Sequence, residues 1–317
     1  MTNSAFRPIV LVGSLDDPHV HAVHEELRAR GRDPLIFDAL RFPEYLRVSL
    51  EQGQAQIELD GRQVGRPSAV YVRSLYQSPA GFGVDAEEAM REDWRKTMMV
   101  FRERTTLLTS ILLRWEALGV PLYNPPSVGA RITKPHQIAL LEAAGLPVPA
   151  TLWTNDPEAV RRFCGEREAI YKPISGGAET RRVEARDLVD ERLDKLRAAP
   201  VCFQELLPGR DVRVYVIDGR VVCALRIDTD EIDFRQHENA IESVELEPEI
   251  EAACVRAAEV IGLRYTGMDI KGDAHGRYKI LELNPSAMFV GFQARTGVDI
   301  CGALCAALMA HTARLES

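Results

Sequence analysis

The chain of 317 residues lacks several features, and each absence excludes a class of protein. Its six cysteines are scattered without a C-x-x-C pair, which argues against a disulfide framework or a structural zinc site. No apolar run approaches the roughly 20 residues of a membrane helix, and the opening MTNSAFRPIVLVGS has no signal-peptide core. An excess of basic charge is absent too: 39 Lys and Arg residues against 47 Asp and Glu give a net charge of −8, which argues against a nucleic-acid partner. The sequence therefore predicts a reduced, cytoplasmic protein with neither a membrane nor a nucleic-acid partner.

Residues 8–38 have the pattern of a strand, a helix and a second strand. The run PIVLVG is rich in β-forming residues, Asp17 can cap a helix that begins at Pro18, and Gly31 can end it. The connection Gly-Ser-Leu-Asp-Asp is not the dinucleotide fingerprint G-x-G-x-x-G. The pattern predicts a βαβ unit. Arg73 follows the later strand AVYV, where open α/β sheets bind ligands, although a surface arginine is an equal alternative.

Short strands at 47–73, around an Asp60–Gly61 turn, are followed by a long helical pattern at Ala86–Leu118. Its apolar side chains are expected to pack in the core: Met90, Trp94, Met98, Phe101, Leu108, Leu112 and Trp115. The strand VPLYNPP then leaves this part of the chain. The pair Pro125–Pro126 marks a domain boundary.

The next segment, 126–200, contains a strand that ends in a lysine and runs into a glycine-rich loop. A helix from Lys134 to Ala144 comes first, and the strand Ala169–Pro173 carries Lys172. The loop after it contains Ser175, Gly176 and Gly177, whose backbone N–H groups could cover phosphates. The loop is no P-loop, because G-x-x-x-x-G-K-[ST] is absent. Apolar strands rarely contain an unpartnered lysine, so Lys172 is the stronger signal.

Residues 201–283 are mostly strands, with a hairpin predicted at Asp218–Gly219. Charged side chains on these strands and in the polar loop that follows them are Asp211, Arg213, Arg226 and Arg235. A helix is expected at Pro248–Leu263, a loop at 286–297, and a closing helix at Val298–Leu315.

A second hairpin is predicted at Tyr265–Asn284, around the turn-forming GDAHG. Antiparallel pairing would bring Asp269 opposite Glu282 or close to it, and strand alternation puts Glu282 and Asn284 on one face. Two carboxylates and an amide oxygen suit Mg²⁺, especially when phosphate oxygens also hold the ion. The alternative is that these are solvated strand residues.

The order of these motifs is specific, although each motif alone is weak. The order is Lys134; Lys172 before Ser175-Gly176-Gly177; Gln204-Glu205-Leu206-Leu207; Asp211-Val212-Arg213; Asp269; and Glu282-Leu283-Asn284-Pro285. Over residues 125–317 the chain resembles the ATP-grasp superfamily of carboxylate ligases. It is most similar to the branch with the ribosomal-protein glutamate ligases and the graspetide (microviridin-type) peptide ligases. Ile-Asp-Phe-Arg at Ile232–Arg235 is similar to the Asp-aromatic-Arg of the graspetide ligases.

The resemblance implies a fold of α/β and α+β type. An N-terminal, Rossmann-like βαβ domain of the pre-ATP-grasp kind would precede a two-lobed ATP-grasp fold. It would dock substrate and span 1–125, with the central lobe at 126–200 and the C-terminal, metal-binding lobe at 201–317.

The resemblance also implies roles for single residues. Lys134 and Lys172 would contact the phosphates and the adenine side of ATP, beneath the loop of Ser175, Gly176 and Gly177. The adenine-reading hinge would be Gln204, Glu205, Leu206 and Leu207, with Asp211 near the ribose. The Mg²⁺ ligands would be Asp269, Glu282 and Asn284, with Mn²⁺ as an alternative ion. The phosphate and acyl-phosphate end would be lined by Arg213, Arg226 and Arg235.

The implied activity is ATP-dependent, ADP-forming ligation of a carboxylate, on a peptide or protein, through an acyl phosphate to an amide or ester. Alternatives are ligation of glutamate, another amino acid or a small metabolite, and a non-catalytic ATP-binding module. Gln236-His237 departs from the small residue and Asn that usually follow Phe-Arg in the glutamate ligases, and Ser286–Phe292 lacks the Trp-rich pattern of graspetide ligases. The acceptor therefore stays open, as does a homodimer.

Overall fold

The computed structural model describes residues 7–38, 46–51, 54–73, 86–175, 179–229 and 240–316. The chain forms two compact units: Met1–Val128 with Pro285–Ser317, and Gly129–Asn284. The last part of the chain, which the sequence assigns to a C-terminal lobe, thus belongs to the same unit as the N-terminus. Among the described residues, no helix is long and apolar enough to cross a membrane.

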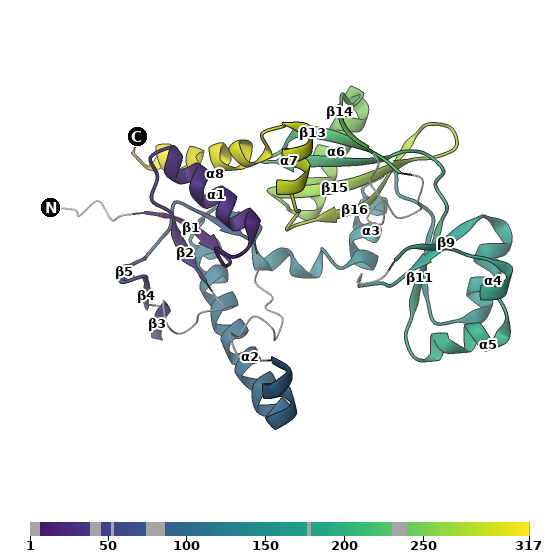
Figure 1. Ribbon diagram of the computed structural model, residues 1–317, viewed down its shortest axis with the longest axis horizontal. Coiled ribbons are helices and arrows are strands. Elements are labelled where there is room, and N and C mark those ends of the chain that lie inside the picture. The colour runs from purple at the N-terminus through teal and green to yellow at the C-terminus, as the bar shows by residue number, and fades with distance from the viewer. Residues whose placement is uncertain are drawn as a thin grey trace. The chain divides into compact units, whose positions relative to one another are not determined.

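The first unit is built on a parallel sheet (Figure 1). Its strands, in the order β2-β1-β6-β7, are Leu35–Phe37, Ile9–Val12, Ala69–Val72 and Leu122–Tyr123. Helix α1 (Pro18–Ala29) joins β1 to β2, which pair in parallel, so the predicted strand–helix–strand is confirmed. The Asp17 carboxylate caps α1 by accepting hydrogen bonds from the N–H groups of His19 and Val20.

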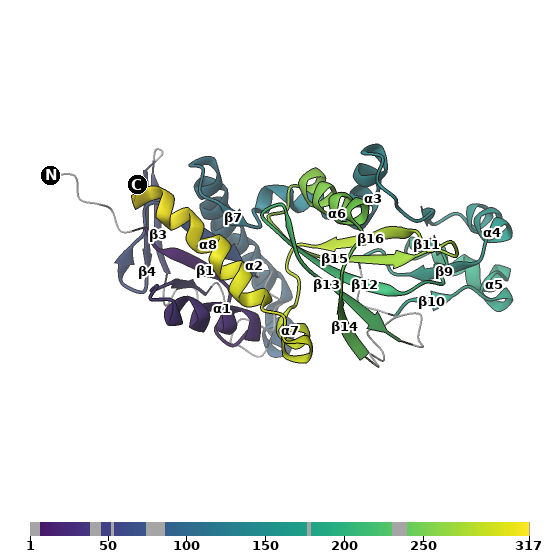
Figure 2. The ribbon, with the colours of Figure 1, turned by 90° about the horizontal axis from the view of Figure 1, so that it is seen from above.

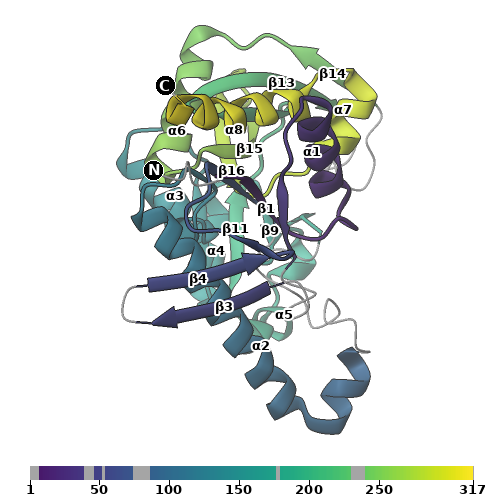
Figure 3. The ribbon, with the colours of Figure 1, turned by 90° about the vertical axis from the view of Figure 1, so that its left-hand side faces the viewer.

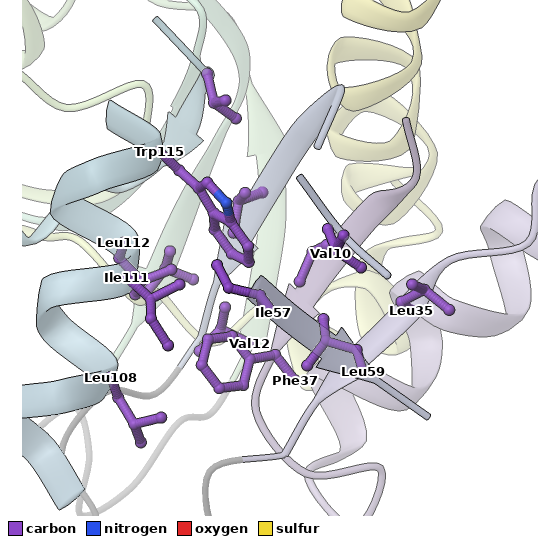
Figure 4. Close-up of a cluster of buried hydrophobic side chains, with 14 of the residues drawn as sticks. Val10, Val12, Leu35, Phe37, Ile57, Leu59, Leu108, Ile111, Leu112 and Trp115 are labelled. Carbon is purple, nitrogen blue, oxygen red and sulfur yellow. The ribbon is translucent and has the colours of Figure 1, made fainter. Parts of the chain in front are cut away.

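A second, antiparallel sheet lies in the same unit (Figure 3). Its strands are β3 (Leu46–Glu51), β4 (Gln54–Leu59) and β5 (Arg62–Gln63). The tight turn between β4 and β5 uses Asp60 and Gly61, both with positive φ, as the turn signal predicted. Figure 4 shows Ile57 and Leu59 of β4 beside Val10 and Val12 of β1, in one buried cluster.

Helix α2 (Ala86–Ala117) covers this cluster with only part of its length. Leu108, Ile111, Leu112 and Trp115 are buried and point toward the strands (Figure 4). The prediction was wrong for two outer positions of the helix, because the Trp94 side chain is 57% exposed and Met98 is 44% exposed. The apolar stripe is continuous in the sequence, but among the described residues the sheets lie only beneath its C-terminal half.

The segment predicted as a loop after Asn284 contains a helix, so that prediction was wrong. Helix α7 spans Val290–Thr296 and ends at Gly297 with φ 72°. The N–H groups of Phe289 and Val290 donate to the Nδ1 atom of His19, at 3.3 and 3.4 Å. This cap comes from α1, about 270 positions earlier in the chain, so no local pattern reveals it. Helix α8 (Ile300–Glu316) follows, and packs beside α1 (Figure 2).

Two further side chains of the first unit hold the start of this segment. Asn124 donates from Nδ2 to the carbonyl oxygen of Pro285 at 2.7 Å. Arg73, at the carboxyl end of β6, donates from Nε to Asp17 at 3.0 Å and from Nη1 to the carbonyl oxygen of Ser286. Arg73, which the sequence placed where a ligand could bind, therefore binds the backbone of the chain itself.

The second unit contains two antiparallel sheets and their helices. The smaller sheet, in the order β10-β9-β11-β8, consists of Arg181–Arg182, Ala169–Lys172, Val201–Glu205 and Thr151–Thr154. Its helices are α4 (Pro157–Glu166), α5 (Asp190–Leu193) and the 3₁₀ turns Ala185–Asp187 and Asp194–Arg197. Val160 of α4 and Phe203 of β11 belong to one buried cluster.

The larger sheet has five strands in the order β14-β13-β12-β15-β16. They are Ala240–Val244, Arg220–Asp228, Asp211–Ile217, Tyr265–Gly272 and Tyr278–Asn284. The 3₁₀ turn Pro126–Ala130 leads to α3 (Lys134–Ala143), which packs on α6 (Pro248–Ile261) and on β16. The predicted hairpins β12–β13 and β15–β16 are both confirmed.

A close backbone contact fixes the ends of two of these strands. The Gly209 N–H, just before β12, donates to the Gly272 carbonyl at 3.0 Å. A Cβ atom on Gly209 would lie 2.5 Å from that oxygen, so only glycine fits there.

His19 makes the stability of the fold depend on pH. Burial and the nearby Arg73 cation lower the pKa of His19, while Asp17 opposes them. The unfolded chain protonates this ring near its ordinary pKa of about 6.5, so below that pH the unfolded state binds more protons than the folded state. The free energy of unfolding should therefore fall as pH drops from about 6.5 toward the folded pKa. We expect that the same drop in pH lowers the urea midpoint less in His19→Asn than in the wild type, because asparagine keeps a hydrogen-bond acceptor but does not titrate.

The matched control is His21→Asn on the exposed face of the same helix, which should keep the wild-type pH profile. An unchanged profile in His19→Asn would contradict this prediction.

Candidate functional site

The hairpin β15–β16 brings three oxygen-bearing side chains to one face of the larger sheet. Asp269 lies directly opposite Glu282, and Gly267 lies opposite Asn284. The Asn284 amide nitrogen is 3.2 Å from Glu282 Oε1 and 3.4 Å from Asp269 Oδ2. Antiparallel pairing in the hairpin brings the two carboxylates together, and the period of two residues in a strand puts Glu282 and Asn284 on one face, as the sequence predicted.

Arg213 on β12 lies on the other side of Asp269 in the same sheet. The two residues are cross-strand partners, and the guanidinium binds the carboxylate through two bonds, Nε–Oδ1 at 2.6 Å and Nη2–Oδ2 at 3.1 Å. Both residues are buried, at 9% and 8% exposed. Burial of such a pair is tolerated because the planar guanidinium matches both carboxylate oxygens.

Two lysines approach the same face from other elements. Lys134 begins α3, and its Nζ lies 2.6 Å from Glu282 Oε2. Lys172, at the end of β9, donates from Nζ to Oε1 of Gln204 at 3.1 Å. Gln204 is itself buried and donates to the Thr151 hydroxyl at 3.0 Å. Lys172 was expected to have a polar partner because it lies on an apolar strand, and that partner is the amide oxygen of Gln204.

These neighbours shift the pKa values of the site. Burial raises the pKa of Asp269 to about 6, and Glu282 adds to the rise while Arg213 opposes it. For Glu282, burial raises the pKa but the Lys134 and Lys172 cations outweigh it, so the pKa is lowered. Burial lowers the pKa of Lys172, with Lys134 contributing and Glu282 opposing. The shifts show that the two lysines and the two carboxylates share one electrostatic environment.

The expected adenine hinge continues from β11. The N–H of Glu205 donates to the Ala150 carbonyl, and the N–H of Leu206 donates to the Glu168 carbonyl, both at 2.9 Å. An adenine contact would therefore have to use other groups of this stretch, such as the N–H of Leu207. The Glu205 side chain binds the Lys279 ammonium.

Asp211, expected near the ribose, is buried and accepts a hydrogen bond from Lys271 Nζ at 2.6 Å. Asp211 and Lys271 are cross-strand partners, two residues before Arg213 and two after Asp269, so they lie on the face of the candidate site. Ser175 is exposed just beyond β9. Gly176 and Gly177 lie outside the described residues, as does Arg235.

One expected residue does not join the others. Arg226 on β13 is the cross-strand partner of Val212, whereas Arg213 is the partner of Leu225. Since paired residues share a face, the Arg226 side chain lies on the opposite face of the sheet from Arg213. It forms ion pairs with Asp228 at 3.3 Å and with Glu242 on β14. The sequence predicted strand β13 but not its register against β12. A shift of one residue moves every side chain of a strand to the other face of the sheet.

One residue of the site was missed in the sequence. Gln137 on α3 is 1% exposed and binds the backbone of Leu283 at both its N–H and its carbonyl group. Leu283 lies between Glu282 and Asn284. The one signal in the sequence was that Gln137 lies about one helical turn after Lys134, and this spacing does not reveal that Gln137 binds Leu283.

The three oxygen-bearing side chains fit a magnesium ion that is bound together with phosphates. Among the described residues there is no cluster of three or more His, Cys, Asp or Glu side chains that could hold a metal. The set consists instead of the carboxylates of Asp269 and Glu282 and the amide of Asn284. Mg²⁺ is usually bound by one or two carboxylates with phosphate oxygens and water, so this donor set suits a metal–polyphosphate complex.

Comparison with known proteins gives a family and a solved relative. Residues 133–308 match the model of the RimK-like ATP-grasp domain. The chain is similar to a solved structure of the ATP-grasp ligase PsnB, in complex with a phosphomimetic variant of a minimal precursor, Mg and ADP. The sequences are 60% identical, and the match covers 96% of this chain and 99% of PsnB with a TM-score of 0.90.

Two further similarities are more distant. A probable α-L-glutamate ligase of Thioalkalivibrio sulfidiphilus is 30% identical over 211 residues, or 61% of this chain and 69% of that protein. The macrocyclase MdnC, solved with the precursor peptide MdnA from Microcystis aeruginosa MRC, has a TM-score of 0.80 over 95% of this chain and 99% of MdnC. At 23% identity, the likeness to MdnC shows the fold alone.

The buried pair of Arg213 and Asp269 gives a stability prediction. Arg213→Met should lower the free energy of unfolding by about 3–5 kcal/mol, because it leaves the Asp269 charge buried without its partner. The double variant Arg213→Met/Asp269→Asn should lose less than the single variant, since it removes that charge. Urea unfolding without nucleotide or metal measures both.

The control is Arg62→Met, which breaks an exposed ion pair with Asp33 and should lower the free energy of unfolding far less than Arg213→Met does. Equal losses in the single and double Arg213 variants would show that the unpaired charge is not the cause.

Proposed function

The chain belongs to the RimK-like ATP-grasp family and is an ATP-dependent carboxylate ligase, and we propose that its substrate is a peptide or protein in which it forms amide or ester bonds. The observation that carries this proposal is the 60% identity to PsnB, over 96% of this chain. PsnB was solved with a minimal precursor. A relative so similar over nearly the full length supports a substrate of the same kind.

The chemistry requires a carboxylate to acquire a leaving group. Transfer of the γ-phosphoryl group of ATP produces an acyl phosphate and ADP, and the acceptor hydroxyl or amine then expels phosphate. Phosphoryl transfer depends on charge neutralisation and alignment more than on covalent help from the protein. Mg²⁺, when bound, would supply positive charge at the phosphate oxygens. The proposed site needs no serine or cysteine nucleophile.

We assign the residues of the second unit to these tasks. Lys134 and Lys172 would bind the phosphates, and Asp269, Glu282 and Asn284 would hold Mg²⁺. The ion pair between Lys134 and Glu282 supports this assignment. On arrival of Mg²⁺ and ATP the lysine can exchange its carboxylate partner for phosphate, and Glu282 can exchange its ammonium partner for the metal. Each of the two charges would then keep a partner of opposite sign.

Other parts of the nucleotide would meet β11 and β12. The stretch from Gln204 through Glu205 and Leu206 to Leu207 would form the adenine hinge, and Asp211 would lie near the ribose. Arg213 would bind the reacting carboxylate or the acyl phosphate, for which a guanidinium fork is suited. Four more residues are assigned. Ser175, at the edge of the described residues, and Gly176 and Gly177, outside them, would cover the phosphates, and Arg235, also outside them, would lie at the acyl-phosphate end.

A second candidate function is ligation of glutamate, supported by the relatives named as probable α-L-glutamate ligases. Product mass separates the two functions. Loss of one water per bond from a peptide indicates a bond within that peptide, whereas gain of an amino-acid residue indicates tagging. A non-catalytic module would bind ATP without turnover.

The reaction is tested by incubating the chain with ATP, Mg²⁺ and candidate precursor peptides, encoded beside the gene and rich in Thr, Ser, Lys and acidic residues. We expect ADP and phosphate, and a peptide product that has lost one water per bond. AMP and pyrophosphate would contradict the acyl-phosphate route.

Glu282→Ala should reduce turnover by more than about 100-fold through loss of a metal ligand, because even outer-shell changes at metal sites cost 10–100-fold. The fold should persist, since the Glu282 side chain is partly exposed. Coupled ADP release measures the effect. Glu259→Ala, on the exposed side of α6, is the matched carboxylate control and should turn over normally. Normal turnover by the Glu282 variant would refute the metal assignment.

We also propose that the chain forms a homodimer through the outer part of α2 and works in the cytoplasm, with the first unit docking the substrate. The apolar stripe whose C-terminal half packs on the sheets continues outward through Trp94 and Met98, which are exposed. A second copy of α2 can cover this stripe with an apolar surface of the same kind.

The dimer is tested by measuring the molar mass of the protein with light scattering as it elutes from a size-exclusion column. We expect about twice the 35.4 kDa of one chain. Met98→Glu should weaken dimerisation about tenfold or more, since it puts a charge into an apolar contact. Leu113→Glu changes an exposed leucine of the same helix off the stripe and should leave the mass unchanged. A monomeric wild type would contradict the proposal.

A further inference from the structure

We propose that Gln137 is a positioning residue that fixes the metal-binding end of β16 from its open side. Strand β16 is the last strand of the five-stranded sheet, with β15 as its one strand neighbour in the described part of the chain. Gln137 accepts a hydrogen bond from the Leu283 N–H at 2.8 Å and donates one to the Leu283 carbonyl at 3.0 Å. Its side-chain amide thereby replaces the missing neighbouring strand for one residue.

The position of this contact matters because Glu282 and Asn284 flank Leu283. The regular ladder pairs Gly267 with Asn284 and Asp269 with Glu282, but the register shifts directly after Asp269, so the site lies at the end of a short regular stretch. A slip of one residue would turn Glu282 and Asn284 to the opposite face of the sheet. A buried amide bound to both backbone groups of Leu283 prevents that slip.

The same helical turn also holds the Glu282 side chain. Lys134 and Gln137 are three residues apart and lie on one side of α3. Lys134 reaches the Glu282 carboxylate, while Gln137 reaches the backbone of the next residue. Helix α3 therefore fixes both strand β16 and the Glu282 carboxylate of the proposed magnesium site.

The inference rests on the proposed metal site and differs from a purely structural role in what it predicts. Loss of a buried hydrogen bond lowers stability wherever it occurs. Loss of a positioning residue also lowers the affinity of the folded protein for Mg²⁺. Because Mg²⁺ demands near-ideal octahedral geometry, its binding should suffer more than that of Mn²⁺.

The test is Gln137→Met, which keeps the length of the side chain but not its hydrogen bonds. We expect faster hydrogen exchange at Leu283 in the apoprotein, and a roughly tenfold weaker Mg²⁺ affinity in the presence of ADP, by calorimetry. The affinity for Mn²⁺ should change less. If Gln137→Met fails to fold, Gln137→Asn keeps the amide and shortens it by one methylene, and the same result is expected.

Gln293→Met is the matched control. Its Oε1 atom accepts a hydrogen bond from the Cys301 N–H at 2.8 Å in the other unit, so the substitution removes a similar side chain–backbone bond. It should lower stability without changing Mg²⁺ affinity. Wild-type Mg²⁺ affinity in the Gln137 variants would overturn the inference alone. Failure of the wild type to bind Mg²⁺ with ADP would instead overturn the proposed function.

Discussion

The candidate site depends on the buried, two-bond contact between Arg213 and Asp269. A carboxylate at this depth would otherwise favour its protonated form, and burial indeed raises its pKa. The guanidinium opposes that shift and fixes the direction of both oxygens. Because the two residues are cross-strand partners, this contact also sets the register of β12 against β15 on the face that carries the site.

Around this pair the charges are arranged so that each has a partner before any ligand binds. Lys134 is paired with Glu282, and Lys172 is bound by Gln204. In the proposed function these contacts would be exchanged for phosphate and metal contacts, so that no charge of the site would lose its partner, which would be costly. A site of this kind can stay folded when empty and still bind a highly charged nucleotide. The chemistry of the family, in which alignment and neutralisation matter most, fits that design.

Local patterns predicted a large part of this architecture. The hairpin at Tyr265–Asn284 was predicted from its glycine-containing turn, with Asp269 opposite Glu282 or close to it, and the structure pairs the two directly. The predictions failed where the outcome depends on distant parts of the chain. Arg226 was assigned to the site although its register puts it on the other face, and Trp94 was assigned to a core that does not extend so far. In each case the strand or helix was predicted correctly, but the elements packed against it decided whether the side chain is buried or which face it lies on.

The sequence by itself determined most strands and helices, the order of the motifs and the hairpin that brings the two carboxylates near each other, because these depend on residues close together in the chain. Only the tertiary structure decided which side chains join them. Gln137 meets Leu283 across 146 positions, and His19 caps a helix 270 positions away. Arg213 and Asp269 are 56 positions apart. Contacts of this kind follow from how the elements pack and from strand register, which no local periodicity encodes.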